Sequence, residues 1–86
     1  MIEYYYLYRN IPKLDLHGKT SFEMIVLVDG FIKENKAMKN YLIGIIHGKG
    51  SGILKRELHK YLKNNRSVVD FKLNIYNDGE TIVEIK

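Results

Sequence analysis

Apolar and polar residues follow two different periods along the chain, and the change from one period to the other predicts its elements. Residues 14–16 alternate as in a half-buried strand, and residues 21–35 carry apolar side chains at helical spacing. Residues 41–46 are a continuous apolar run, which is typical of a central strand. Residues 68–76 alternate again, and residues 81–85 are the final strand.

Two of these segments are predicted helices with different beginnings. Thr20 and Glu23 fit a capping box at the start of the first helix. The second helix follows a glycine-rich turn at residues 47–52, and one of its sides is an apolar stripe: Leu54, Leu58, Tyr61 and Leu62. Its other side carries a row formed by Lys55, His59 and Lys63, with Arg56 and Lys60 beside it. We therefore expect this helix to pack on one side and to be wet and cationic on the other.

The order of elements is strand, helix, strand, helix, strand, strand, which predicts an α/β fold. We expect a two-layer α/β sandwich, in which a mixed sheet of about four strands packs against two helices on one face. Right-handed crossovers make the first three strands parallel, and Asn77-Asp78-Gly79 predicts a hairpin that adds an antiparallel fourth. A tyrosine-rich segment, residues 1–12, precedes this domain at residues 13–86 and favours an extra strand or an aromatic cover.

Composition narrows the setting in which such a domain works. The 86 residues make one domain, with no room for a second core. The absence of cysteine excludes disulfides and thiolate metal sites and fits a reducing, cytoplasmic location. No apolar run approaches the roughly 20 residues of a membrane span, and no signal peptide is visible, so we expect no membrane partner.

The positive charge of the chain is concentrated on one element. The net charge is +4, and residues 47–66 hold six basic residues against one acidic residue, a net +5. The remaining eight basic and nine acidic residues sum to −1. A field concentrated on one element favours a polyanionic partner, whereas the alternative is a solvated helix face that happens to be basic.

Both predicted strand-to-helix turns leave the carboxyl ends of adjacent parallel strands, where open α/β sheets bind ligands. The first turn contributes Asp15 and His17. His17 is a candidate general acid, general base or phosphate ligand near neutral pH, or a merely structural residue. Asp15 is a candidate to orient an imidazole, to bind a divalent ion or to activate water, and its alternative role is to cap the backbone.

The second turn has the form of a phosphate-binding turn. Its glycines permit positive φ and close approach, and its backbone N–H groups lie at the positive end of the following helix. Lys49 is placed to neutralise a phosphate, and His47 either contacts an anion or hydrogen-bonds the turn. The spacing is not that of a Walker loop, and two histidines are too few for a tight zinc site. The candidate phosphate-binding residues are His47, Gly48, Lys49, Gly50, Gly52, Lys55, Arg56 and Lys60.

Two motifs in these turns carry a family resemblance. Residues 14–18, Leu-Asp-Leu-His-Gly, resemble the LDLHG signature of the Smr (small MutS-related) domain family, and residues 47–50, His-Gly-Lys-Gly, resemble its HGxG signature. The similarity runs from about Lys13 to Lys86. The first motif carries over Asp15 and His17, and the second carries over the four residues 47–50. Many members have a richer glycine cluster before the final strand, where this chain has only Asn77-Asp78-Gly79.

The resemblance implies an α/β sandwich similar to the C-terminal domain of a bacterial translation initiation factor, nucleic-acid binding and, in a number of members, endonuclease activity on DNA or RNA. Our first hypothesis is a nuclease with weak sequence preference, in which Asp15 with Mg²⁺ or Mn²⁺, or His17 as general base, prepares the nucleophile. The second is a non-catalytic module that binds nucleic acid or the ribosome, or serves a MutS-like partner. A third is a protein-interaction domain that uses the open sheet face.

Overall fold

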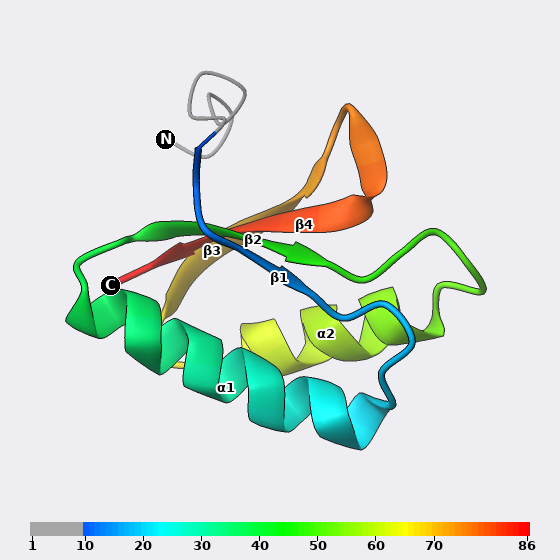
Figure 1. Cartoon of the computed structure of the whole chain (residues 1–86), viewed down its shortest axis with the longest axis horizontal. Coiled ribbons are helices and arrows are strands. Elements are labelled where there is room, and N and C mark those ends of the chain that lie inside the picture. Colours follow the sequence, from blue (N-terminus) through cyan, green and yellow to red (C-terminus); the bar gives the residue numbers. More distant parts are fainter. Residues whose placement is uncertain (1–9) are drawn as a thin grey trace.

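The computed structural model describes residues 10–86 as six elements in the predicted order (Figure 1). They are β1 (Lys13–Asp15), α1 (Ser21–Ala37), β2 (Leu42–Ile46), α2 (Ile53–Lys63), β3 (Val68–Asn74) and β4 (Asn77–Ile85). The extra strand or aromatic cover predicted at the N-terminus falls largely on residues 1–9, which lie outside the described residues, so it stays a prediction.

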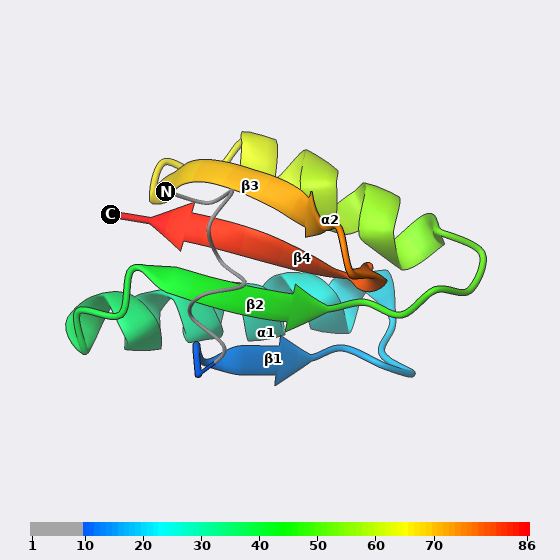
Figure 2. The ribbon, with the colours of Figure 1, turned by 90° about the horizontal axis from the view of Figure 1, so that it is seen from above.

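The domain has two layers, because both helices lie against the same face of one four-stranded sheet (Figure 1). The strand order is β1-β2-β4-β3 (Figure 2). Strands β1 and β2 are parallel, and β4 is antiparallel to both of its neighbours. The first three strands therefore share one direction, as predicted. The last strand lies between β2 and β3, a position that the sequence pattern did not specify.

The core fills the space between the sheet and the two helices. Ten buried apolar side chains form it: Leu16, Met24, Val28, Ile32, Ile43, Ile45, Leu58, Leu62, Val83 and Ile85. Burial of one such side chain contributes about 1.5–3 kcal/mol. The predicted stripe of α2 is confirmed, since its two leucines in the core are joined by Leu54 and Tyr61 packed against it. Within residues 10–86, neither helix is long and apolar enough to cross a bilayer.

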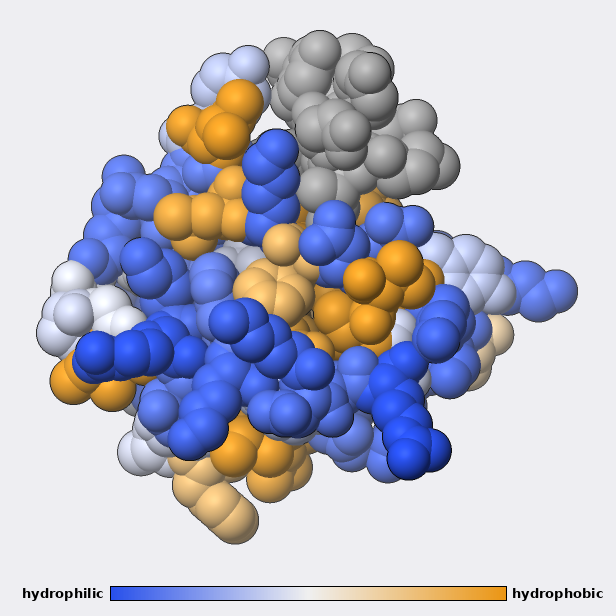
Figure 3. Space-filling model, turned by 180° about the vertical axis from the view of Figure 1, so that it is seen from behind, coloured by the Kyte–Doolittle hydropathy of each residue, from blue (hydrophilic) through white to orange (hydrophobic). Residues whose placement is uncertain are grey.

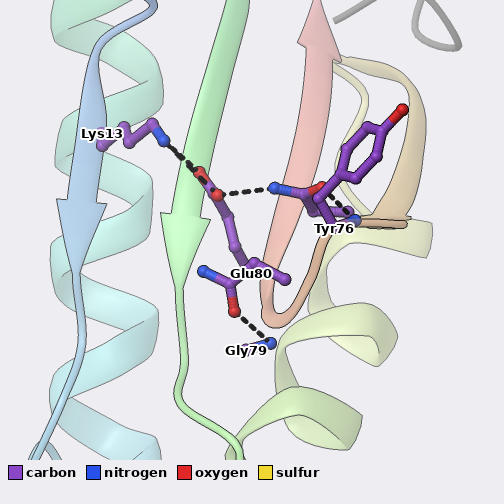
Figure 4. Close-up of polar contacts among 6 residues, drawn as sticks. Lys13, Tyr76, Gly79 and Glu80 are labelled. Carbon is purple, nitrogen blue, oxygen red and sulfur yellow. Dashed lines mark hydrogen bonds and ion pairs between the residues drawn. The ribbon is translucent and has the colours of Figure 1, made fainter. Parts of the chain in front are cut away.

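The hairpin between β3 and β4 turns at Ile75 and Tyr76, so the predicted turn at Asn77-Asp78-Gly79 is wrong. Side-chain oxygens hold the two bends, because Asn74 Oδ1 accepts the N–H of Tyr76 at 2.8 Å and Asn77 Oδ1 accepts the N–H of Gly79 at 3.0 Å (Figure 4). Asn74 pairs with Asn77 and Leu73 with Thr81, so residues 78–80 bulge out of the β3 ladder. Strand β4 consequently begins four residues before the predicted strand.

The alternation predicted for β3 fails at both ends. Val69 and Ile75 are 53% and 72% exposed, whereas Val68 and Phe71 pack against the core. A bulge between Val68 and Asp70 places an extra residue in β3, and each such residue moves the following side chains to the other face.

The face of the sheet away from the helices carries a buried carboxylate. Glu80, whose side chain is 2% exposed, lies 3.2 Å from the Lys13 ammonium and accepts a hydrogen bond from Asn74 at 3.0 Å (Figure 4). It passes over Gly44, where a Cβ would collide with its carboxylate. These contacts tie the start of β4 to both outer strands, and they place Gly79 beside the end of β2.

Candidate functional site

The turn from β1 to α1 satisfies its own polar groups. Asp15 Oδ1 accepts the N–H of His17 at 2.8 Å. The predicted capping box is present, since Thr20 Oγ1 accepts the N–H of Glu23 at 3.1 Å and Glu23 accepts the N–H of Thr20 at 2.8 Å. These hydrogen bonds lower the pKa of Glu23. The positive end of α1 is therefore already occupied by a carboxylate of this chain.

The turn from β2 to α2 leaves its polar groups open. Gly48 and Gly52 have φ of 86° and 83°, a left-handed conformation in which glycine is favoured. Gly52 is the N-cap of α2 and has no side chain to cap it. Ser51 Oγ accepts the N–H of Ile53 at 3.4 Å, and the first turn of the helix holds no acidic residue. In residues 10–86, the backbone N–H groups of residues 49–52 have no hydrogen-bond partner. Uncapped donors at a positive helix end are the features of an anion site.

Gly79 holds this second turn in place. Its carbonyl oxygen accepts the N–H groups of both His47 and Gly48, each at 2.9 Å. A Cβ at Gly79 would lie 3.1 Å from Lys49 Cγ and 3.2 Å from the carbonyl carbon of Gly48, which is tighter than ordinary packing. Gly79 was predicted only as part of a hairpin turn, and its role beneath the second turn was not predicted. The asparagine two residues before a glycine was the available signal, because Asn77 forms the local bend that presents Gly79.

The two turns meet at a small pocket, which we call the turn pocket. Its volume is about 260 Å³. It is lined by His17, His47, Gly48, Lys49, Gly50, Ser51, Gly52, Leu54 and Lys55. The structure thus brings the exposed His17 together with the phosphate-binding residues predicted in the second turn. Asp15 is not among the lining residues, and its carboxylate acts on the backbone of His17.

A second hollow, the α2 groove, continues along the helix from the turn pocket. It has a volume of about 570 Å³ and is lined by Ser51, Gly52, Lys55, Arg56, His59, Lys60 and Lys63. The first three of these residues also line the turn pocket, so the two hollows share a wall. Figure 3, the view from behind, shows mostly hydrophilic side chains with hydrophobic patches between them over the lower half of the molecule, where α2 lies. Lys49, which lines the turn pocket, does not line the α2 groove and is paired with Asp78 at 3.7 Å on the surface.

His47 lines the turn pocket and supports the turn from inside. Its ring is buried, with Nδ1 3.0 Å from the Gly48 carbonyl oxygen and Nε2 2.9 Å from Thr81 Oγ1. The hydrogen bond to the turn, one of the two alternatives predicted for this residue, is present, and the contact with an anion stays a prediction. Burial lowers the pKa of His47, which keeps the imidazole neutral near pH 7.

The predicted divalent-ion site at Asp15 has few protein ligands in the described part of the chain. Within residues 10–86, no three side chains among His, Asp and Glu are grouped as a metal site. One oxygen of Asp15, the candidate ligand, already accepts the N–H of His17. Because Mg²⁺ and Mn²⁺ are commonly held by one or two carboxylates together with water molecules and substrate phosphates, the use of a divalent ion at Asp15 stays a prediction.

Comparisons with known proteins agree on one family. The model of the Smr domain matches residues 14–86. The chain is 34% identical over 76 residues to the endonuclease MutS2 of Caldicellulosiruptor bescii and 36% identical over 77 residues to that of a Geobacillus species. These matches cover 85% and 86% of the chain but only 10% of each relative. The chain thus spans about a tenth of the length of these relatives.

Two solved structures share the fold. The Smr domain of Thermus thermophilus MutS2 superposes with a TM-score of 0.86 at 26% identity, over 88% of this chain and 99% of that one. YdaL, a stand-alone small MutS-related protein from Escherichia coli, superposes with a TM-score of 0.81 at 22% identity, over 86% of this chain and 63% of that one. The two-layer sandwich is therefore the fold of solved Smr proteins.

Proposed function

Because this chain belongs to the Smr domain family, we propose that it binds the phosphate backbone of nucleic acids and cleaves it as a weakly sequence-specific endonuclease. One observation carries this proposal. The uncapped, carboxylate-free start of α2 opens into the turn pocket beside the exposed imidazole of His17. Curated relatives are named endonucleases, but since the chain spans a tenth of their length, the activity comes to it only as a proposal.

Binding uses the turn pocket for one phosphate and the α2 groove for its neighbours along the strand. The free N–H groups of residues 49–52 donate to the first phosphate, and the cations of the groove, Lys55, Arg56 and Lys60 among them, neutralise the next. Contacts of this kind position a backbone and carry no base readout, which is the reason for weak sequence preference.

In the proposed cleavage reaction, His17 acts as the general base. Neutral His17 takes a proton from a water molecule, the water oxygen attacks phosphorus, and the bond from phosphorus to the leaving sugar oxygen breaks, with a solvent proton restoring the hydroxyl. The turn N–H groups and Lys49 stabilise the negative charge that grows on the phosphate oxygens. Asp15 is a positioning residue, because its carboxylate holds the backbone of His17 rather than lining the pocket.

The test is cleavage of supercoiled DNA and of a single-stranded RNA in the presence of Mg²⁺, Mn²⁺ or EDTA. The His17→Ala variant is expected to cleave at least about a hundredfold more slowly than the wild type, because a general base usually contributes a factor of that size or more. Its affinity for nucleic acid is expected to stay within about twofold of the wild-type value. Asp15→Asn is the matched control, because the amide oxygen still accepts the N–H of His17, and it is expected to keep most of the activity. The three metal conditions test the predicted use of a divalent ion.

Equal cleavage by the wild type and both variants, all purified identically, would contradict this assignment. Salt-sensitive binding without any cleavage would favour the second function, a non-catalytic nucleic-acid or ribosome-associated module. One observation gives that alternative its support: in the described chain no carboxylate lines the turn pocket, and His17 is the one exposed histidine there. A cytoplasmic location and a MutS-like or ribosomal partner belong to the same proposal.

A further inference from the structure

One hydroxyl group joins two histidines beneath the α2 groove. Thr81 Oγ1, fully buried on β4, lies 2.9 Å from Nε2 of His47 and 2.7 Å from Nε2 of His59. His59 belongs to α2 and lines the groove, and its ring packs against Phe71 with centroids 4.9 Å apart. The arrangement connects the groove to the turn, because His47 also contacts the carbonyl oxygen of Gly48.

The direction of these hydrogen bonds follows from donor counting. A carbonyl oxygen only accepts, so the Nδ1 of His47 must carry the proton that points at Gly48. The Nε2 of neutral His47 is then bare and accepts the Thr81 hydroxyl proton. That hydroxyl has one proton, so its oxygen can only accept from His59, whose Nε2 must carry a proton.

The same counting tells where a further proton can be added. A proton on Nε2 of His47 would face the Thr81 hydroxyl proton and break the chain of hydrogen bonds. A proton on Nδ1 of His59 leaves every hydrogen bond intact, and that nitrogen has no partner within residues 10–86. His59 is therefore the histidine of this pair that can become charged without local rearrangement.

The groups around His59 disfavour a positive charge on its imidazole as long as the groove holds no anion. Lys55, Lys60 and Lys63 flank it on α2 together with Arg56, His47 lies behind Thr81, and Phe71 covers the ring from β3. In the described part of the chain no carboxylate lines the groove. Burial, followed by the charges of His47, Lys55 and Lys63, accordingly lowers the pKa of His59.

We propose that His59 is a proton-linked phosphate ligand: a phosphodiester group enters the α2 groove together with one proton, which is held on Nδ1 of His59. This inference rests on the proposed function. A bound phosphate makes the protonation of His59 more favourable, because it neutralises the flanking cations and offers a hydrogen-bond acceptor to the protonated ring. The expected partner is a backbone with successive phosphates, held more tightly as the pH falls below neutral. Lysine and arginine stay charged throughout this range and cannot supply the pH dependence.

The test measures the affinity for a rhodamine-labelled oligothymidylate by fluorescence anisotropy at about pH 7.5 and pH 5.5, at one ionic strength. Thymine and phosphodiesters do not titrate between these values, so the pH dependence belongs to the protein. Wild-type affinity is expected to rise roughly tenfold, well within the limit for one linked proton over two pH units. His59→Gln keeps an N–H donor for Thr81 and is expected to lose most of this rise. His59→Lys carries a permanent charge and is expected to bind tightly at both values.

A direct reading comes from the imidazole nitrogen signals of the wild-type protein, which distinguish tautomers and charge. The free protein is expected to show His47 protonated on Nδ1 and His59 on Nε2, and the oligonucleotide is expected to convert His59 to the doubly protonated form at pH 6.5. These spectra decide the question even if the variants do not fold.

The outcomes separate the two proposals. Salt-sensitive binding with the same pH dependence in the wild type and in His59→Gln would overturn the role of His59 and leave the proposed function standing. A neutral His59 in the complex would do the same. Absence of salt-sensitive binding at either pH, by a protein with a folded spectrum, would remove the proposed function and this inference with it.

Discussion

The two strand-to-helix turns leave the same edge of the sheet, yet only one of them is open to an anion. At the first, Thr20 caps α1 and Glu23, at the third helical position, returns to the N-cap backbone. At the second, Gly52 caps α2 without a side chain, and the third helical position is Lys55. Both helices present the same dipole, but the side chains at two equivalent positions place a carboxylate at the first turn and a lysine at the second.

The difference also explains how the motif residues divide their work. The first turn is a closed structure that contributes one side chain, His17, to the turn pocket. The second turn contributes its backbone. Its glycines, and the hydrogen bonds that the Gly79 carbonyl oxygen accepts from His47 and Gly48, leave the N–H groups of residues 49–52 open. A pocket that combines a rigid, self-capped wall with an uncapped helix start can hold a phosphate without losing the order of either turn.

The largest effect is expected from making the second turn resemble the first. Lys55→Glu places a carboxylate at the position that Glu23 occupies in α1. Nucleic-acid affinity is expected to fall ten- to hundredfold, or about 1.4–2.7 kcal/mol, while the acidic first turn stabilises α2 slightly. Anisotropy titrations and thermal unfolding measure the two opposite changes. Lys55→Gln is the matched control, and equal losses in both variants would refute the charge argument.

A smaller effect on nucleic-acid affinity is expected from disturbing the contact between Gly79 and the second turn. Gly79→Ala brings a Cβ within 3.1–3.3 Å of Lys49, Gly48 and Asn77. Stability is expected to fall by about 1–3 kcal/mol, as for other overpacked sites, and binding with it. Gly30→Ala is the control, because Gly30 lies in α1 with open space around it and the same change there should stabilise by about 0.5–1 kcal/mol. Urea unfolding that shows equal effects at both glycines would sink this account.

The histidines behind the second turn predict a modest pH dependence of stability. Because the pKa values of His47 and His59 are lowered in the folded state, the unfolded chain binds more protons below about pH 6.5. Their contribution to the stability of the folded state is fully present above that pH, and it is lost as the pH falls toward the pKa values of the folded state. Tm in the absence of nucleic acid is expected to drop by a few degrees between pH 7.5 and 5.5. The drop should be smaller in His59→Gln, and a Tm that rises on acidification would contradict the sign.

The smallest effect is expected from opening the first turn. Glu23→Gln keeps a side-chain oxygen for the Thr20 N–H but removes the negative charge from the start of α1. A slight decrease in Tm is expected, with nucleic-acid affinity unchanged, because this turn does not bind the phosphate. An affinity gain as large as the loss in Lys55→Glu would show that the two turns compete for the ligand.

Much of the molecule could be predicted from local patterns. The capping box at Thr20, the apolar stripe of α2 and the apolar run of β2 each depend on residues within one or two turns of one another, and all three predictions are confirmed. The motifs around His17 and His47 predicted the family, since their spacing reflects one strand-to-helix connection each. The position of the basic residues on one side of α2 could also be predicted from the sequence, because it follows from helical periodicity.

What only the tertiary structure decided depends on pairing between distant segments. The insertion of β4 between β2 and β3 brings Gly79 under the second turn and Thr81 between two histidines, and no periodicity in the sequence encodes which two strands the final strand lies between. The register shift at the hairpin also depends on distant segments, because it lies beside Glu80, which contacts Lys13 and Asn74 across the sheet. Local sequence therefore determined the elements and their chemistry, and long-range packing determined which of those groups face the same ligand.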